Sequence, residues 1–165
     1  MRIPLFLFCV MLPWASKAEE HPFNYTFEKD LKGHHIEVIL KLKSFDRQQH
    51  RLEKKNGVAY IDGVVPVGTD NSFSAFTEFS QFEVRVDGRS IGIPKSYYAD
   101  LFNASLLPKT NPAFDTHGSI WTTVSDDGEA VLIEFKGSEA GGAYKAWLVI
   151  RRDGKHERFV ESTMP

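Results

Sequence analysis

The sequence has only one cysteine in 165 residues, and this residue, Cys9, lies in an apolar N-terminal stretch. A chain without that stretch has no thiol, so it can form neither an internal disulfide nor a thiolate metal site. Its stability must then come from packing. The apolar run between residues 3 and 14 contains two prolines and is shorter than the roughly 20 residues that a membrane-spanning helix needs. We therefore expect no transmembrane span after the stretch is cleaved.

Residues 1–18 have the features of an export signal peptide. Arg2 supplies positive charge, an apolar run follows, and Ser16 and Ala18 are the small residues expected before a cleavage site. Cleavage after Ala18 leaves residues 19–165, a length typical of one domain, which we expect to be rich in β-structure. Small secreted eukaryotic domains usually carry disulfides. The sequence thus indicates a bacterial protein of the periplasm or the extracellular space.

A large excess of charge of one sign is also absent. Loss of Arg2 and Lys17 with the signal reduces the 20 basic residues to 18 against 22 acidic ones, a formal charge of −4. A nucleic-acid-binding protein usually shows a strongly basic balance. We therefore expect no nucleic acid as partner; the sequence leaves the partner unknown, with another protein or an envelope polymer among the candidates.

Motifs of catalysis and of cofactor binding are lacking too. No serine lies in a strand-to-helix nucleophile elbow: Ser90 matches the letters G-x-S-x-G, but it follows the Asp87-Gly88 turn and begins a predicted strand. The glycine-rich segment 137–142 precedes a predicted strand, whereas a phosphate-binding loop precedes a helix. His35 and Glu37 share a face of one predicted strand, and two ligands are too few for a zinc site. We predict no cofactor and no metal, and we expect no catalysis, although the sequence leaves enzymatic activity open.

The dipeptide Asp-Gly is the strongest structural signal that is present. Both residues tolerate positive φ, which a two-residue hairpin turn of type I′ requires at its two central positions. The dipeptide occurs at 62–63, 87–88, 127–128 and 153–154, each time between segments that can form strands. The sequence therefore predicts up to four hairpins.

The flanking segments alternate apolar and polar residues with a period of two, which is typical of strands that bury one face. Because no helical crossovers separate them, we predict an all-β fold, an antiparallel sandwich or barrel of about 8–10 short strands. The predicted strands are 22–28, 35–44, 57–61, 64–67, 79–86, 90–93, 118–124, 130–136, 143–152 and 155–162.

Three segments depart from this alternation. Pro94 is followed by residues 95–102, for which we predict one short helix because proline is favoured at the first helical position. Residues 46–55 are polar and basic and can form either a long hairpin loop or one exposed helical turn; we favour the loop because they have few apolar residues to hold a helix. Residues 103–117 form a long connection, and connections of that length in a compact domain are often functional.

Aromatic side chains supply most of the candidate surface residues. Phenylalanines recur every three residues at 73, 76, 79 and 82, a spacing that fits neither a regular strand nor a regular helix. They either fill the core at the start of a strand or leave a pair exposed as a binding surface. The candidate ligand or partner surface comprises Phe73, Phe76, Tyr97, Tyr98, Asp115 and His117.

Three functions are compatible with this pattern. The leading hypothesis is an exported, non-catalytic binding or structural module. The second is a barrel-type carrier of a small apolar ligand, since eight or more strands can enclose one. The third is a hydrolase built on the connection 103–117, where Asp115, His117 and Ser119 supply the side-chain types of a triad but no nucleophile elbow surrounds the serine.

Overall fold

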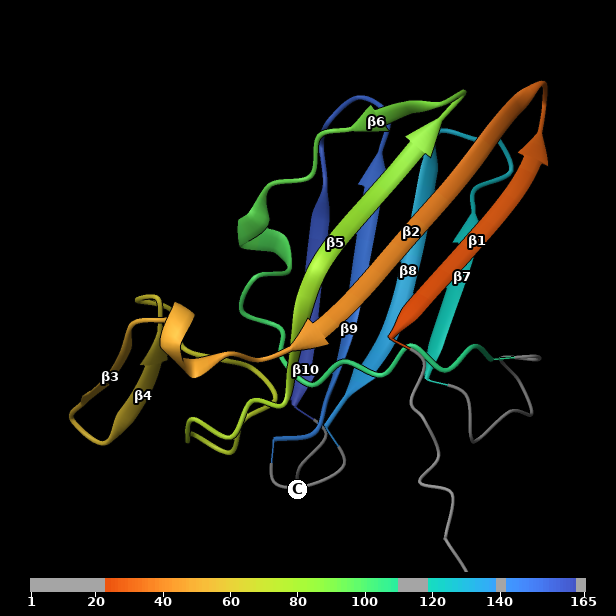
Figure 1. The fold of residues 1–165 in the computed structure, drawn as a ribbon. Helices are drawn as coiled ribbons and strands as arrows, with labels where there is room; N and C mark the ends of the chain where they lie inside the picture. Colours follow the sequence, from red (N-terminus) through yellow and green to blue (C-terminus); the bar gives the residue numbers. More distant parts are fainter. Residues whose placement is uncertain (1–22, 110–118, 139–141, 163–165) are drawn as a thin grey trace, which may run out of the picture.

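The computed structural model describes residues 23–109, 119–138 and 142–162. These residues form two four-stranded antiparallel sheets and one separate two-stranded hairpin (Figure 1). The first sheet has the order β1-β2-β5-β6 and comprises β1 (Asn24–Leu31), β2 (His34–Ser44), β5 (Thr77–Val86) and β6 (Arg89–Ile91). The second sheet has the order β10-β9-β8-β7 and comprises β7 (Ile120–Val124), β8 (Ala130–Gly137), β9 (Tyr144–Arg151) and β10 (Glu157–Ser162). The hairpin pairs β3 (Leu52–Lys55) with β4 (Val58–Ile61).

The two sheets pack face to face as a sandwich and do not close into a barrel (Figure 1). The Tyr25 hydroxyl of β1 donates a hydrogen bond to Thr122 Oγ1 of β7 at 3.0 Å, and the rings of Phe79 and Phe135 meet 5.6 Å apart. The predicted all-β antiparallel fold is therefore confirmed, and the structure selects the sandwich.

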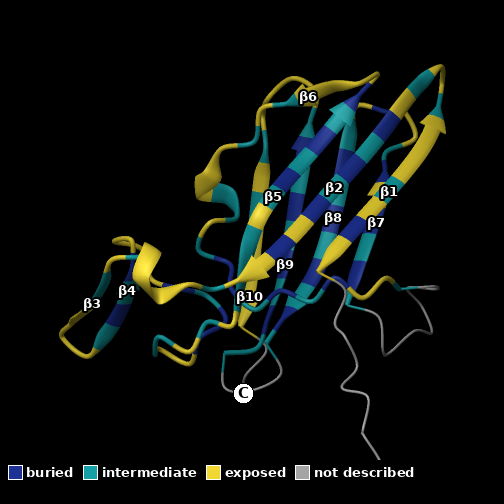
Figure 2. Cartoon of the chain, in the orientation of Figure 1, coloured by how far each residue is buried: buried dark blue, intermediate teal, exposed yellow. Residues whose placement is uncertain are grey.

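Alternation along the strands creates the core. Buried and half-buried residues follow one another along β8 and β9 without interruption, and Figure 2 shows the same banding on β2 and β5. Every second side chain points between the sheets, as the pleat of a strand requires. Fully buried core residues include Ile36, Val38, Leu40, Val84, Ile133, Phe135, Leu148 and Ile150.

A β-bulge explains how two phenylalanines three residues apart, Phe79 and Phe82, both face the core. The register between β2 and β5 shifts between Lys41 and Leu42, so that Leu40 is opposite Phe82 while Leu42 is opposite Phe79. The extra residue on β5 brings Phe79 and Phe82 to the same inner face, with ring centroids 5.4 Å apart. Core filling is thus correct for these two rings.

The four Asp-Gly dipeptides all lie at chain reversals, but they form two kinds of turn. At 62–63 and 87–88 both residues have positive φ, 52° for each aspartate and 75° to 83° for the glycines. At 127–128 and 153–154 only the glycine does, because the aspartate side chain accepts hydrogen bonds from the backbone N–H two residues ahead. Two further two-residue turns, Lys32-Gly33 and Asn56-Gly57, join β1 to β2 and β3 to β4.

Three local predictions are wrong. Residues 52–55, expected in a loop, form β3, because Asn56-Gly57 turns the chain so that β3 pairs with β4. The expected strand 64–67 has only isolated bridges at Val64 and Val67. The expected helix 95–102 is one 3₁₀ turn, Lys95–Tyr97, because the backbone at residues 100–102 pairs with Val67 instead. The described part of the chain contains no helix long and apolar enough to cross a membrane.

Candidate functional site

The predicted surface residues divide between exposed and packed positions. Phe76 is 75% exposed and Phe73 is half-buried, both in the connection from β4 to β5. Tyr98 instead stacks on Phe82, with ring centroids 5.0 Å apart and an interplanar angle of 16°. Tyr97 donates from its hydroxyl to the His156 carbonyl at 2.9 Å. The two tyrosines therefore hold the segment after β6 against the sandwich. Asp115 and His117 lie outside the described residues.

A different set of aromatic side chains lies on the outer face of the second sheet. In the strand register Phe159 of β10 is opposite Trp147 of β9, Trp147 is opposite Glu134 of β8, and Glu134 is opposite Trp121 of β7. Residues directly opposite one another in antiparallel strands point to the same face of the sheet. Three aromatic rings and one carboxylate thus form a single row across all four strands.

The row faces away from the core. The neighbours of Trp147 along β9, Ala146 and Leu148, are both fully buried between the sheets. Trp147 and Trp121 are half-buried, and Phe159 is 59% exposed. Two aliphatic residues, Leu132 and Val149, lie opposite each other in the adjacent row of the same outer face. We call the whole set the aromatic face, and it comprises Trp121, Leu132, Trp147, Val149 and Phe159.

Charges around the aromatic face are of both signs. The Lys109 ammonium lies 3.0 Å from the Glu134 carboxylate, and the Lys109 side chain is only 8% exposed. Lys109 is placed by its backbone, whose N–H donates to the Ile120 carbonyl at the edge of β7. In the adjacent row of the same outer face, Glu161 is opposite Lys145, and Lys145 is opposite Lys136. The electrostatic potential of the aromatic face is therefore not of one sign throughout.

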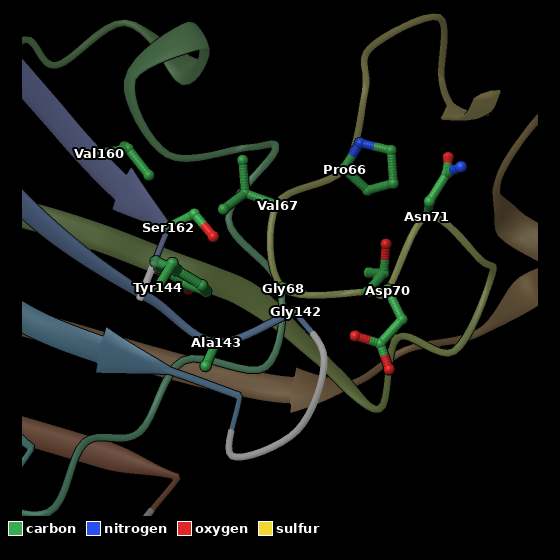
Figure 3. A pocket seen from close by; sticks show the side chains of 11 residues that line it. Pro66, Val67, Gly68, Asp70, Asn71, Gly142, Ala143, Tyr144, Val160 and Ser162 are labelled. Atoms are coloured by element: carbon green, nitrogen blue, oxygen red, sulfur yellow. The ribbon is translucent and has the colours of Figure 1, made fainter. Parts of the chain in front are cut away.

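A groove of about 590 Å³ lies on the other side of β10. Figure 3 shows Val160 and Ser162 of β10 on one side of it and Asp70 and Asn71 on the other. The Asn71 side chain connects the loop that contains Asp70 and Asn71 to the hairpin β3–β4, because its Oδ1 accepts from the Ala59 N–H and its Nδ2 donates to the Gly57 carbonyl.

The floor of the groove is built by close backbone packing. A Cβ on Gly142 would lie 2.6 Å from the Thr69 nitrogen, so only glycine fits there. The lack of a side chain at Gly142 thus lets the backbone of residues 68–70 pack directly against it. Tyr144 is fully buried beneath it, and burial raises the pKa of the Tyr144 hydroxyl, which donates to the Phe102 carbonyl at 3.0 Å. Thr69 is buried and its Oγ1 has no hydrogen-bond partner among the described residues. The groove is a second candidate site.

His50 joins the hairpin β3–β4 to the end of the first sheet. Its side chain is 11% exposed, stacks on Phe45 with centroids 4.6 Å apart, and contacts Asp62 at 2.7 Å and Glu78 at 3.2 Å. Burial alone lowers the pKa of His50, but the hydrogen bonds to the two carboxylates outweigh it, so the pKa lies above its ordinary value of 6.5. The hydrogen bond with His50 in turn lowers the pKa of Asp62.

The adjacent histidines at the start of β2 form two separate pairs. His34 lies 2.7 Å from Asp87, and His35 lies 2.7 Å from Asp30. Within residues 23–109, 119–138 and 142–162, no three side chains of the metal-ligating types are grouped closely enough to hold a metal ion. These histidines tie strands of the first sheet together.

Comparisons with protein-family models, with curated proteins and with solved structures find no match to this chain. A functional assignment must therefore rest on the residues and their geometry.

Sequence reasoning missed the aromatic face, although the pattern contains it. The same alternation that assigns Ile133, Leu148 and Ile150 to the core leaves Trp147 and Val149 in the opposite phase. Large apolar residues in the solvent phase of a strand indicate a binding surface. What the pattern lacks is the pairing of strands, which aligns Trp121, Trp147 and Phe159 in one row.

Proposed function

We propose that this protein is an exported, non-catalytic binding module whose binding surface is the aromatic face. The observation that carries the proposal is the cross-strand row of Trp121, Trp147 and Phe159 on the side of the sheet turned away from the core. Aromatic residues are enriched where proteins make contacts, and contiguous apolar surface on a soluble protein marks interaction sites. These side chains do not belong to the cluster that fills the sandwich.

Export to the periplasm or the extracellular space is part of the proposal. It is supported by Arg2, the apolar run after it, and the small residues Ser16 and Ala18. In such compartments a binding module meets envelope polymers and other exported proteins. A mature chain of residues 19–165 retains every strand that the structure describes.

The alternative hypotheses have less support. A barrel carrier needs a closed barrel around a cavity, whereas the two sheets are open and the space between them is filled by side chains such as Leu40, Ile133 and Leu148. The hydrolase hypothesis depends on the connection 103–117, and residues 110–117 of it lie outside the described part of the chain. The aromatic face is therefore the surface that we assign to function.

The test is retention of residues 19–165 by a total envelope preparation of the source cells in a sedimentation assay. We expect the wild-type protein to sediment with the preparation, and the double variant Trp121→Ala/Trp147→Ala to stay in solution. Two variants serve as controls. Ile39→Ala removes a half-buried apolar side chain from the outer face of the first sheet, and Val160→Ala changes the groove. Equal retention of the double variant and the wild type would exclude the aromatic face as the binding surface.

A further inference from the structure

We infer that the aromatic face binds a neutral polysaccharide chain that lies across the strands of the second sheet. This inference rests on the proposed function and names its ligand class. It is based on the direction of the aromatic row, on the charges beside it and on its narrow width.

The row is long in one direction. Neighbouring strands lie about 4.8 Å apart, so the row from Trp121 on β7 to Phe159 on β10 crosses three strand spacings, roughly 14 Å. A ligand that contacts all three rings must be elongated and must run perpendicular to the strands. A polymer chain with repeated flat units has this shape.

Aromatic rings suit the faces of sugar rings. A pyranose ring exposes C–H groups on its faces and hydroxyl groups around its edge, so it has an apolar face although it dissolves in water. The face of an aromatic ring is the negative part of its quadrupole and attracts C–H groups, and stacking removes apolar surface of both rings from water. Trp121 and Trp147 are half-buried among their neighbours, so their conformations are already restricted before binding.

Polar groups lie within the row and beside it, where they can reach sugar hydroxyls. Glu134 is in the middle of the row, between Trp147 and Trp121, and is paired with Lys109. A carboxylate has about four acceptor positions, so Glu134 can accept from a hydroxyl group while it remains bound to Lys109. Thr123 lies on the same outer face of β7 as Trp121, two residues further on, and is exposed.

The charges favour a neutral ligand over a charged one. A polyanion or an anionic membrane needs a surface of uniformly positive potential. Here Lys109 is paired with Glu134, and Lys145 lies opposite both Glu161 and Lys136, so charges of both signs lie close together. Neither sign of charge on a ligand would be attracted to the whole face.

The width of the face favours a chain over a protein surface. A stable protein interface takes about 20–30 residues from each partner. The aromatic face has five apolar residues, and a charged row, Glu161, Lys145 and Lys136, borders it on one side. Such a strip fits a single polymer chain.

The experiment uses affinity electrophoresis of residues 19–165 through gels that contain one soluble polysaccharide each. The neutral probes are a mixed-linkage β-glucan, a xylan, a galactomannan and a dextran, and alginate is the anionic probe. We expect retardation by at least one neutral polysaccharide, with an affinity that changes less than about twofold between 0.05 and 0.5 M salt because no ion pair forms. No retardation by alginate is expected.

Tryptophan fluorescence follows the same binding at the proposed site. The chain has three tryptophans, and removal of residues 1–18 takes Trp14 away, so only Trp121 and Trp147 remain. Both lie on the aromatic face. Titration with the polysaccharide that retards the protein should change their emission with the same affinity.

Matched variants identify the surface. Phe159 and Val160 are neighbours on β10, both exposed, and they point to the aromatic face and to the groove respectively. We expect Trp147→Ala to weaken binding at least about tenfold, Trp147→Phe to weaken it less, and Phe159→Ala to weaken it about threefold or more. Val160→Ala and Ile39→Ala should stay within about twofold. Thermal unfolding checks that each variant folds, and the Trp, Phe, Ala series at position 147 separates stacking from a loss of fold.

Each outcome is decisive for the ligand class. Envelope retention that depends on the aromatic face, without retardation by any neutral polysaccharide, would overturn the sugar assignment and leave the proposed function standing. Retention that disappears when the envelope preparation is treated with protease would assign a protein partner to the aromatic face, and this would also overturn the sugar assignment. Loss of envelope retention in Val160→Ala but not in Phe159→Ala would overturn both proposals in favour of the groove.

Discussion

The outer faces of the two sheets differ, although their inner faces are built in the same way. On the first sheet the outward side chains are mostly charged and paired with one another: Arg85 contacts Glu83 at 2.9 Å and Glu37 at 3.2 Å. On the second sheet the corresponding positions include Trp121 and Trp147. A solvated sheet face needs only polar side chains, so the aromatic side chains of the second sheet require another explanation. We assign them to ligand binding.

The largest expected effect is a difference in stability between variants of the inner and of the outer apolar residues of the second sheet. Ile133→Ala removes a fully buried side chain and should lower the free energy of unfolding by about 2–5 kcal/mol. Leu132→Ala, one residue earlier on β8, removes a half-buried side chain of the aromatic face and should cost about 1 kcal/mol or less. Urea-induced unfolding measures both. Equal losses would mean that Leu132 is part of a packed core, and the comparison of the two outer faces would fail.

A smaller effect concerns pH. Because the pKa of His50 is raised on folding, protonated His50 stabilises the folded state; this contribution is complete below its ordinary pKa of 6.5 and is lost as pH rises through the raised value. The lowered pKa of Asp62 gives a contribution that is present above 3.8 and is lost as pH falls through the lowered value. We expect wild-type protein to lose stability as pH rises above 6.5 and through the raised pKa of His50, and His50→Asn to lose less over the same range.

Two measurements complete this test. His35→Asn is the matched control: the hydrogen bond to Asp30 also raises the pKa of His35, but the pair is exposed and should contribute little. Chemical denaturation at several pH values follows stability, and affinity for the ligand of the aromatic face is measured in parallel. We expect affinity to stay constant while stability changes. An affinity that followed the titration of His50 would link the two regions that we describe as independent.

The smallest expected effect is on the ion pairs of the first sheet. Arg85→Met removes contacts with Glu83 and Glu37, and because the Arg85 side chain is 36% exposed, solvent screening should make this loss of stability smaller than the others predicted here. The loss should shrink further at high salt. Unfolding at low and high salt measures it. A loss as large as that of Ile133→Ala and independent of salt would show that this charged face contributes to stability as a packed core does.

Much of the fold could be predicted because its signals are local. Alternation in the segments around Val38, Val84 and Ile133 assigned their strands and their buried face. The turn at Lys32-Gly33 was not predicted, because lysine is not a usual residue at positive φ. The strand β3 was not predicted either, because Leu52 alone gives little apolar signal. That strand depends on pairing with β4 and on the contacts of His50, which are distant in sequence.

The candidate site could not be predicted in the same way. The sequence assigns Phe76, Tyr97 and Tyr98 to a candidate surface, whereas Tyr98 stacks on Phe82 and packs against the core. The residues of the aromatic face, by contrast, occupy strand positions where the alternation places polar residues, and each one taken alone is a single exception to the pattern. Trp121 and Trp147 are 26 positions apart along the chain, so no short pattern connects them.

The order of residues by itself determined which segments become strands, where four of the reversals fall, and which side of each strand is apolar, because these properties depend on neighbours one or two positions away. Tertiary structure alone decided that the sheets stay open as a sandwich and that two tryptophans and a phenylalanine form one row. The physical reason is strand register: hydrogen bonds between strands set which distant residues lie opposite each other, and a shift of one residue would turn the aromatic row into the core.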